Sequence, residues 1–237
     1  MAVAAKPVHF AEAIDYLRRK LLVGTRAWTD VWQDAHALSF MVAGAMQEAL
    51  VGDFHAAVTR AIAEGRTLAD FRKDFDAIVE RHGWSYKGGR GWRSRVIFET
   101  NVNSAYSAGR FQQAQRLKAQ RPYLRYVHMD PNLTQEDSRH EHAAWHGIIL
   151  PVDDPFWKTH MTPNGWGCRC KVQSLSARDL ARYGFSVSKS APEVKMVERR
   201  VNTPDGPATV KVPFGIDPGF AWNPGDPDTM PKDIFGR

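Results

Sequence analysis

The chain has 237 residues, 43% of them hydrophobic, which is enough apolar material for an ordinary core in one large domain or two small ones. Intrinsic disorder of the whole chain is therefore excluded. No stretch approaches the roughly 20 uninterrupted apolar residues that a membrane span requires. The first ten residues carry one lysine with no long apolar run behind it, so they do not resemble a signal peptide. We expect a soluble protein made in a cytoplasm, with no membrane partner.

Positive charge is concentrated in one segment of a chain whose formal charge is +6 and whose pI is near 9.4. Nine basic residues and the single acid Glu99 lie between Lys87 and Arg125, so this segment carries +8 and the rest of the chain −2. Such a concentration indicates a contact with nucleic acid or an acidic partner. The alternative is a solvated helix face whose counter-charges are supplied by tertiary packing. The candidate contact residues are Arg90, Arg93, Arg95, Arg110, Arg116, Lys118 and Arg121.

The first half of the chain, from about Phe10 to Gln120, has the spacing of helices. Apolar residues recur every three to four positions in three segments, which contain Phe10, Ile14, Leu17, Leu21 and Leu22, then Phe54, Val58 and Ile62, then Phe71, Phe75, Ile78 and Val79. Gly65 and Gly83 are suited to helix ends, and Thr67 is a candidate N-cap. These patterns predict several short helices.

The longest predicted helix runs from Trp92 to Gln120. It follows the glycine-rich segment 87–91 and ends before Pro122, because the residue that precedes a proline disfavours helical geometry. Its centre contains small residues that would allow another backbone to approach closely, and these are Ser104, Ala105, Ala108 and Gly109. An ordinary packing helix with a crowded interface would explain the same residues.

Beyond Pro122 the pattern changes to short strands and loops. Three strands are predicted, at Tyr123–Met129, Gly147–Val152 and Arg169–Gln173. A short helix at Ala177–Tyr183 with Ser176 as its cap comes next, and the turn residues at 203–207 predict a hairpin. The last stretch, 217–237, is rich in Pro, Gly and Asp and is predicted to run as an extended arm over the domain surface or towards a neighbour.

These elements predict an α+β fold with a helical N-terminal half, a long basic helix, a small strand-containing module and an extended C-terminal arm. Three regions follow from the changes in pattern. They are a helical region at 1–86, a central domain at 87–185, and the hairpin with the C-terminal arm at 186–237.

The candidate metal ligands are His142, His146, Cys168 and Cys170. Only one residue separates the two cysteines, so a disulfide between them would close a strained ring, and reduced thiols or metal ligands remain. If the segment around His142 is helical, His142 and His146 lie one turn apart on one face. Two imidazoles and two thiolates would form a closed tetrahedral site of the structural zinc type. The alternative is that the histidines form hydrogen bonds around nearby tryptophans while the cysteines are small core residues.

No catalytic motif is supported. The zinc protease pattern HExxH fails, because the histidine that should follow His140-Glu141 at a fixed distance is missing. Asp153 and Asp154 directly precede a proline, which is typical of turn and cap residues. The glycine-rich segment 87–91 lacks the lysine and hydroxyl arrangement that grips a nucleotide. We therefore expect a protein that is not an enzyme.

Several strings, taken together in order and spacing, resemble the Mu F-like phage head morphogenesis family. They are Glu99–Asn101 with Tyr106 and Gly109–Arg110, Arg139, His142–Gly147, Asp153–Trp157, Pro163–Trp166, Cys168–Cys170, and Gly215–Phe220 with Asn223–Gly225. The resemblance to the family domain covers about residues 92–172. The family-motif residues are Asn101, Tyr106, Gly109, Arg139, Gly147, Trp166 and Arg169.

The resemblance implies a minor capsid protein that acts in procapsid assembly and DNA packaging, and it makes 87–185 the family domain. Its implied partners are portal and capsid proteins, with non-specific double-stranded DNA as a further candidate. Its implied location is the interior of the procapsid or virion, and the host cytoplasm during assembly. The competing hypothesis is a metal-dependent nuclease or toxin-like hydrolase that uses the His and Cys residues. A closed metal shell would argue against that hypothesis, and an exchangeable metal-bound water would argue for it.

Overall fold

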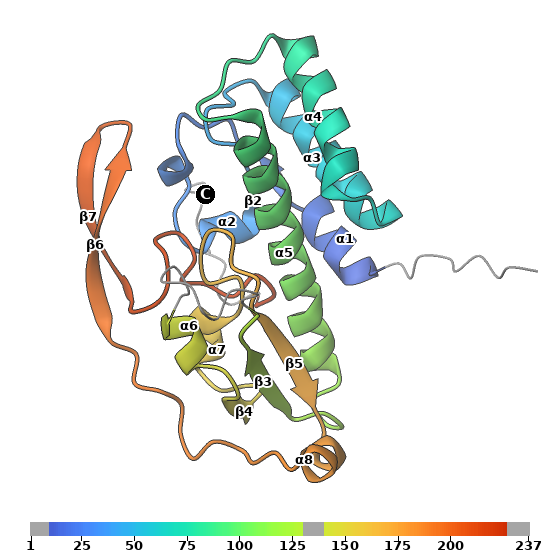
Figure 1. Ribbon diagram of the computed structural model, residues 1–237, viewed down its shortest axis with the longest axis vertical. Coiled ribbons are helices and arrows are strands. Elements are labelled where there is room, and N and C mark those ends of the chain that lie inside the picture. Colours follow the sequence, from blue (N-terminus) through green and yellow to red (C-terminus); the bar gives the residue numbers. More distant parts are fainter. Residues whose placement is uncertain (1–9, 130–139, 227–237) are drawn as a thin grey trace, which may run out of the picture.

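One long helix organises the molecule. The computed structural model describes residues 10–129 and 140–226, and within them helix α5 (Arg90–Arg116) runs through the centre, with helices around its first part and a small sheet beside its second part (Figure 1). Ile97 and Ala105 of α5 belong to a core shared with the N-terminal helices. Phe111 and Ala114, further along the same helix, belong to a second core under the sheet. The helix therefore joins two apolar clusters.

Three main helices precede α5, and the break between the second and third and the end of the third lie at the predicted residues. They are α1 (Ala11–Arg18), α3 (Glu48–Glu64) and α4 (Leu68–His82). Thr67 caps α4: its hydroxyl accepts from the Asp70 N–H, and the Asp70 carboxylate accepts from the Thr67 N–H. Gly65 and Gly83 end α3 and α4 with φ of +67° and +58°, in the left-handed region that favours glycine.

The helical pattern of the first segment stops earlier than predicted. Helix α1 ends at Arg18, and β1 (Leu21–Leu22) pairs in parallel with β2 (Ser39–Phe40). The stretch between them holds the short helices η1 (Trp28–Asp30) and α2 (Ala35–Leu38). Lys20 determines this path, because its buried ammonium group donates to the backbone carbonyls of His36 and Ser39. Periodicity alone could not reveal that long-range contact.

The sheet is three-stranded, antiparallel and ordered β4-β3-β5. Its strands are β3 (Tyr123–Val127), β4 (Ile149–Pro151) and β5 (Lys171–Leu175), each at a predicted position. The register pairs Val127 with Lys171 at one end of β3 and β5. Two short helices, α6 (His140–Ala144) and α7 (Trp157–His160), lie in the connection between β3 and β5 and supply part of the second core.

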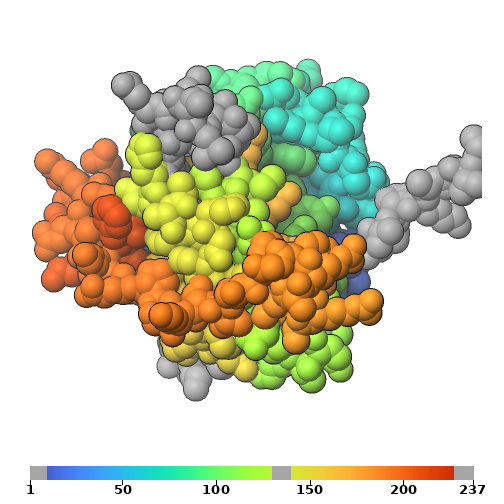
Figure 2. Space-filling model, turned by 60° about the horizontal axis from the view of Figure 1, so that its bottom comes forward, coloured from blue at the N-terminus to red at the C-terminus, as the bar shows by residue number. Residues whose placement is uncertain are grey.

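A long segment then crosses one face of the molecule. Helix α8 (Ala177–Tyr183) has the predicted Ser176 cap, and the orange chain that leads from it towards β6 runs beside the yellow residues of the strand-containing module in Figure 2. Ser188 fastens this chain to β4, because its N–H donates to the carbonyl of Ile149 and its hydroxyl accepts from the Ile149 N–H. The crossing segment thereby provides hydrogen-bond partners for the Ile149 backbone groups at the outer edge of β4.

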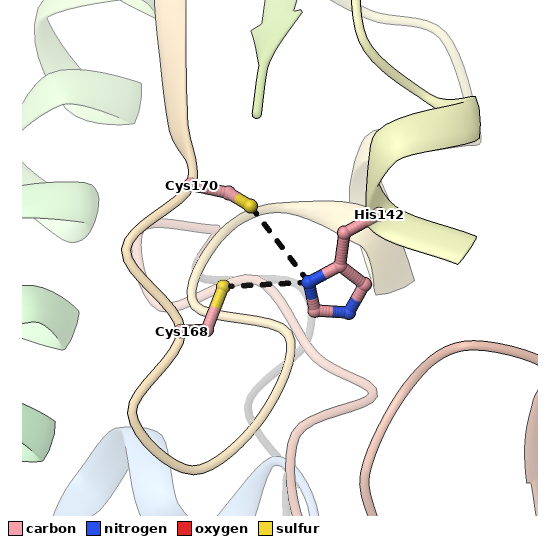
Figure 3. A group of neighbouring side chains, drawn as sticks. All are labelled: His142, Cys168 and Cys170. Atoms are coloured by element: carbon pink, nitrogen blue, oxygen red, sulfur yellow. Dashed lines mark hydrogen bonds between the residues drawn. The ribbon is translucent and has the colours of Figure 1, made fainter. Parts of the chain in front are cut away.

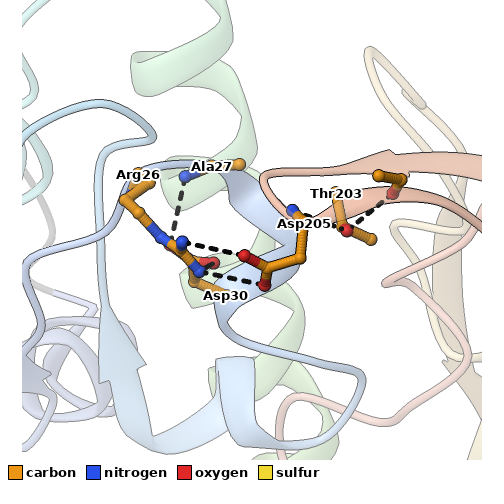
Figure 4. Close-up of polar contacts among 6 residues, drawn as sticks. Arg26, Ala27, Asp30, Thr203 and Asp205 are labelled. Carbon is orange, nitrogen blue, oxygen red and sulfur yellow. Dashed lines mark hydrogen bonds and ion pairs between the residues drawn. The ribbon is translucent and has the colours of Figure 1, made fainter.

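The predicted hairpin is present and its tip contacts the N-terminal part of the chain. Strands β6 (Met196–Thr203) and β7 (Gly206–Pro213) are joined by a two-residue turn. The Arg26 guanidinium donates to both carboxylate oxygens of Asp205, at 3.2 and 3.3 Å, and also contacts Asp30 (Figure 4). Both Arg26 and Asp205 are exposed, so this ion pair orients the hairpin more than it stabilises the fold.

The stretch after the hairpin has no helix or strand up to residue 226, as an extended arm requires. Two of its aromatic side chains are nevertheless buried, and Phe220 and Trp222 are only 5% and 6% exposed. Gly225 lies so close to α5 that an added Cβ would be 2.6 Å from the carbonyl oxygen of Ala108. This part of the arm is therefore a component of the core.

The fold is α+β, as predicted, with helices in the first half and strands later. In the part of the chain that the structure describes, no helix has both the length and the apolar character needed to cross a membrane. The regional boundaries at 86 and 185 remain predictions.

Candidate metal centre and basic helix

Three of the predicted metal ligands meet inside the second core (Figure 3). His142 comes from α6, and Cys168 and Cys170 come from the loop that leads into β5. The His142 Nδ1 lies 3.7 Å from each of the two Sγ atoms. The three side chains are buried, with exposed fractions of 1%, 5% and 8% respectively. Among the described residues this is the one group of three or more His, Cys, Asp or Glu side chains close enough to share a metal ion.

The local backbone aims these side chains at one another. The Cys168 N–H donates to the Gly165 carbonyl, and Gly167 has a φ of +68°, so the chain turns sharply before the two cysteines. The His142 Nε2 lies 2.7 Å from the Gly215 carbonyl oxygen. A carbonyl only accepts, so Nε2 carries the proton and Nδ1 presents a lone pair to both thiols.

A hydrogen bond between the two thiols shifts their pKa values in opposite directions. The pKa of Cys170 is lowered, first because it accepts a hydrogen bond from Cys168 and also because of its contact with His142. The pKa of Cys168 is raised, first by the same hydrogen bond and then by burial. The deprotonated form of such a thiol is the one that binds metal ions.

His146 does not join the cluster, and this corrects the prediction that it shares a helix face with His142. Helix α6 ends at Ala144, and Gly147, with a φ of +84°, turns the chain towards β4. The helical turn that would align the two histidines is therefore missing. His146 is exposed, and its Nδ1 accepts from the backbone N–H of His128 at 3.2 Å.

His128 is the residue that sequence reasoning missed. Its Nδ1 lies 3.3 Å from the Cys170 Sγ. The strand register explains this: Val127 pairs with Lys171, so the next opposed positions are His128 and Cys170. A predicted pairing of these two strands in the correct register would have revealed it. Periodicity within each strand could not.

The carboxylates near the cluster have structural roles, as the sequence indicates. The Asp154 Oδ1 accepts from the Phe156 N–H at 2.9 Å, which is a turn contact. Asp153 pairs with Lys118 at 2.9 Å, and this hydrogen bond lowers the pKa of its carboxyl group. Neither carboxylate belongs to the His and Cys group.

Four of the nine cations of the basic segment are paired with carboxylates. The carboxylate partners come from other elements, and the pairs are Arg90 with Asp76, Arg116 with Glu12, Lys118 with Asp153 and Arg121 with Asp179. Arg93 is buried, donates to the Ala43 carbonyl and lies over the Trp84 ring. Of the other candidate contact residues, Arg95 and Arg110 are exposed and form no ion pair with a described residue. The tertiary packing thus supplies counter-charges for part of the segment.

The described family-motif residues fall into two kinds of position, those needed for backbone geometry and those whose side chains pack or pair. Gly109 and Gly147 are needed for backbone geometry: an added Cβ at Gly109 would lie 3.0 Å from the Ala13 nitrogen, and Gly147 has positive φ. The other side chains pack or pair at the surface of α5 and its neighbours. Asn101 donates to the Ile97 carbonyl, Tyr106 packs on Phe10, Trp166 packs on Trp28 and Phe220, and Arg169 lies 3.8 Å from Glu99. Arg139 lies outside the described residues.

An aromatic cavity of about 310 Å³ lies beside the first turns of α5. Its lining includes the motif residues Asn101 and Trp166, together with Trp92 from α5 and Trp222 from the C-terminal arm. Lys20 lies at its edge, where burial lowers the pKa of the ammonium group to about 7. The C-terminal arm is therefore needed to form this cavity.

Comparisons with known proteins place this architecture in a family. A sequence profile described as "Phage Mu protein F like protein" matches residues 52–173, from α3 into β5. The chain is 31% identical over 239 residues to "Putative capsid assembly protein F" of Escherichia phage Mu, with 90% of this chain and 54% of that protein covered. It is 34% identical over 181 residues to "Mu-like prophage FluMu F protein" of Haemophilus influenzae, with 72% and 43% covered.

The chain thus spans about half the length of these curated relatives. No solved structure matches it. The match covers α5, β3, β4, the start of β5 and the group of His142, Cys168 and Cys170. The chain therefore belongs to the Phage Mu protein F like family.

Proposed function

We propose that this chain acts in the assembly of a phage head, as a minor component that binds portal or capsid proteins and contributes to procapsid assembly and DNA packaging. The observation that carries the proposal is the similarity to the capsid assembly protein F of phage Mu over 90% of this chain. A fold by itself does not determine function, so the proposal rests on this extended similarity and not on the α+β architecture. Its expected location is the procapsid or virion.

Protein contact is better supported than DNA contact as the means of action. Affinity for DNA comes from free cations that displace condensed counterions from phosphates. Among the candidate cations, Arg90, Arg116, Lys118 and Arg121 are paired with carboxylates, and Arg93 is buried. Of the seven candidate cations, Arg95 and Arg110 alone are exposed without a carboxylate partner among the described residues. Two such cations by themselves support only weak, salt-sensitive binding.

The proposal predicts that deletion of the gene abolishes infectious particles or lowers their number, while growth of the host is unchanged. Mass spectrometry of purified procapsids and virions should detect the chain in at least one of them. The chain should also co-purify with the portal or capsid protein of the same phage when the proteins are co-expressed. Absence from both kinds of particle would refute the proposal.

DNA contact is tested by a matched pair of variants. We expect the purified chain to bind duplex DNA only weakly near physiological salt. Arg95→Gln with Arg110→Gln should reduce the salt dependence by a slope of about 2, and Arg90→Gln, which removes a paired cation, should not. Particle formation that survives the double variant would support protein contact. Tight binding that the double variant abolishes, together with loss of particles, would instead make DNA the partner.

A further inference from the structure

We propose that this protein binds one structural zinc ion through His128, His142, Cys168 and Cys170. Three of these ligands are the buried group described above, and His128 is the fourth. The site is independent of the proposed role in head assembly, because it is argued from donor atoms and their surroundings alone.

The spacing of the donor atoms matches ligands that share a metal. Zn–S bonds of about 2.3 Å and Zn–N bonds of about 2.0–2.1 Å place neighbouring donors roughly 3.5–3.8 Å apart at tetrahedral angles. The His142 Nδ1 is 3.7 Å from each Sγ, and the Sγ of Cys170 is 3.3 Å from the His128 Nδ1. The donor atoms of His142, Cys168 and Cys170 thus surround one point, and His128 adjoins this group through its contact with Cys170.

The charge and softness of the donors suit zinc. Two thiolates and two neutral imidazoles bring a net charge of −2, so a dication yields a neutral site that can be buried at little cost. Binding releases thiol protons to solvent and requires no oxidant. Thiolate and imidazole ligands with tetrahedral spacing select zinc over the hard cations magnesium and calcium.

The surroundings of His142 resemble those of a metal-ligating histidine. The Nε2–H donates to the Gly215 carbonyl at 2.7 Å, which fixes the tautomer that leaves Nδ1 free to ligate. The ring also stacks on Trp145, with ring centroids 5.2 Å apart. The C-terminal arm, which contributes Gly215, is thereby coupled to the site.

His128 has no competing use for its ring in the part of the chain that the structure describes. Its Nδ1 faces Cys170, while its Nε2 is buried with no hydrogen-bond partner there. The exposed His146 accepts from the backbone N–H of His128 through its Nδ1, and its Nε2 lies against Arg125. Neither contact involves a donor atom of the proposed site.

Four protein ligands leave no open position for a substrate or a water, so the ion would be structural. It would connect the end of β3, helix α6 and the loop before β5. Such a module gains much from a cross-link that does not depend on an oxidising compartment.

The first measurement is elemental analysis of the full chain, purified without a histidine tag. We expect about one zinc per chain. Replacement by Co²⁺ should give the intense visible absorption of a tetrahedral ion and the near-ultraviolet bands of cobalt–thiolate bonds. Removal of the metal with a chelator should lower the thermal unfolding temperature, and added zinc should restore it.

Matched variants separate the proposed ligand from its neighbour. His128→Ala should weaken zinc affinity at least about 100-fold, as measured by competition with a chromophoric chelator, because a direct ligand is lost. His146→Ala changes an exposed side chain that contacts the backbone of His128 and none of the proposed ligand atoms. This variant should retain about one zinc and the same Co²⁺ spectrum. Cys168→Ser and Cys170→Ser should each remove one thiolate from the cobalt bands.

Two results would overturn the assignment without depending on the folding of any variant. Wild-type protein that is folded by circular dichroism but binds no zinc, even when zinc is added, would show that the four residues are packing elements. Wild-type protein whose Co²⁺ spectrum indicates five- or six-coordination would show an open shell and favour the hydrolase hypothesis. A His128→Ala variant with unchanged affinity would remove His128 from the ligand set.

Discussion

Gly109 shows how one small residue determines the packing of two helices. Helix α1 crosses α5 at this position, where an added Cβ would lie 2.7 Å from the Phe10 ring and 3.0 Å from the Ala13 nitrogen. The neighbouring Ala105 and Ala108 are completely buried. A backbone nitrogen cannot move aside cheaply, so the close approach of the two helices requires glycine.

Gly109→Ala should therefore destabilise the protein although alanine favours helix. The helical gain is about 1 kcal/mol, while overpacking costs about 1–3 kcal/mol, and because the obstructing Ala13 nitrogen is backbone we expect a net loss of up to about 2 kcal/mol in the free energy of unfolding. Gly52→Ala is the matched control, because the nearest atom to its added Cβ is the end of the Leu22 side chain at 3.4 Å. The Gly52→Ala variant should gain up to about 1 kcal/mol in the free energy of unfolding. Urea unfolding of both variants tests the comparison, which fails if the two changes have the same sign.

At the scale of elements, helices α1 and α5 are also joined by an ion pair. Glu12 of α1 accepts from Arg116 in the last turn of α5, and the Gln113 amide donates to the same carboxylate at 3.2 Å. The hydrogen bond from Arg116 holds the pKa of Glu12 below its usual value of 4.5. Glu12 is 18% exposed and Arg116 is 60% exposed, so solvent screens much of the interaction.

The lowered pKa of Glu12 makes the contribution of this pair depend on pH. Because the folded pKa is depressed, the stabilisation is present above 4.5 and is lost as the pH falls through the folded value. Glu12→Gln should lower the free energy of unfolding by about 0.5–1 kcal/mol near neutral pH, and the difference from wild type should shrink in acid. Unfolding curves at a series of pH values measure this, and about 1 M salt should also reduce the difference. A difference that grows in acid would contradict the assignment.

At the scale of the whole molecule, the C-terminal arm completes the structure that the first half begins. Trp222 is 6% exposed, donates its Nε1–H to the Gly219 carbonyl at 2.8 Å and stacks near His36 of α2. The arm also supplies the carbonyl of Gly215 to the metal cluster. Chain segments about 190 residues apart in sequence thus share one interior.

Trp222→Ala should destabilise the protein by about 3–5 kcal/mol, because it leaves a large cavity in the core. Trp92→Ala is the control: Trp92 lines the same aromatic cavity but is 57% exposed, so its loss should cost less than about 1 kcal/mol. Chemical denaturation of the two variants measures the difference. Equal effects would mean that the arm is only loosely attached.

Local patterns in the sequence determined the helix caps, the ends of two main helices and the positions of the main strands. The caps at Thr67 and Ser176, the helix-ending Gly65 and Gly83, and the five main strands lie where short-range rules predict them. These features depend on a few neighbouring residues, so they can be read without knowledge of the fold. The resemblance that identified the family also rests on short strings in a fixed order.

Only the tertiary structure decided which residues share a site. The sequence predicted His146 beside His142 because it extended a helix that ends at Ala144, and it overlooked His128, which the register of β3 and β5 places opposite Cys170. Four of the nine cations in the basic segment are likewise paired only because acids from distant elements pack against them. Both outcomes depend on long-range pairing, and the spacing of residues along one segment carries no information about which distant segment will lie beside it.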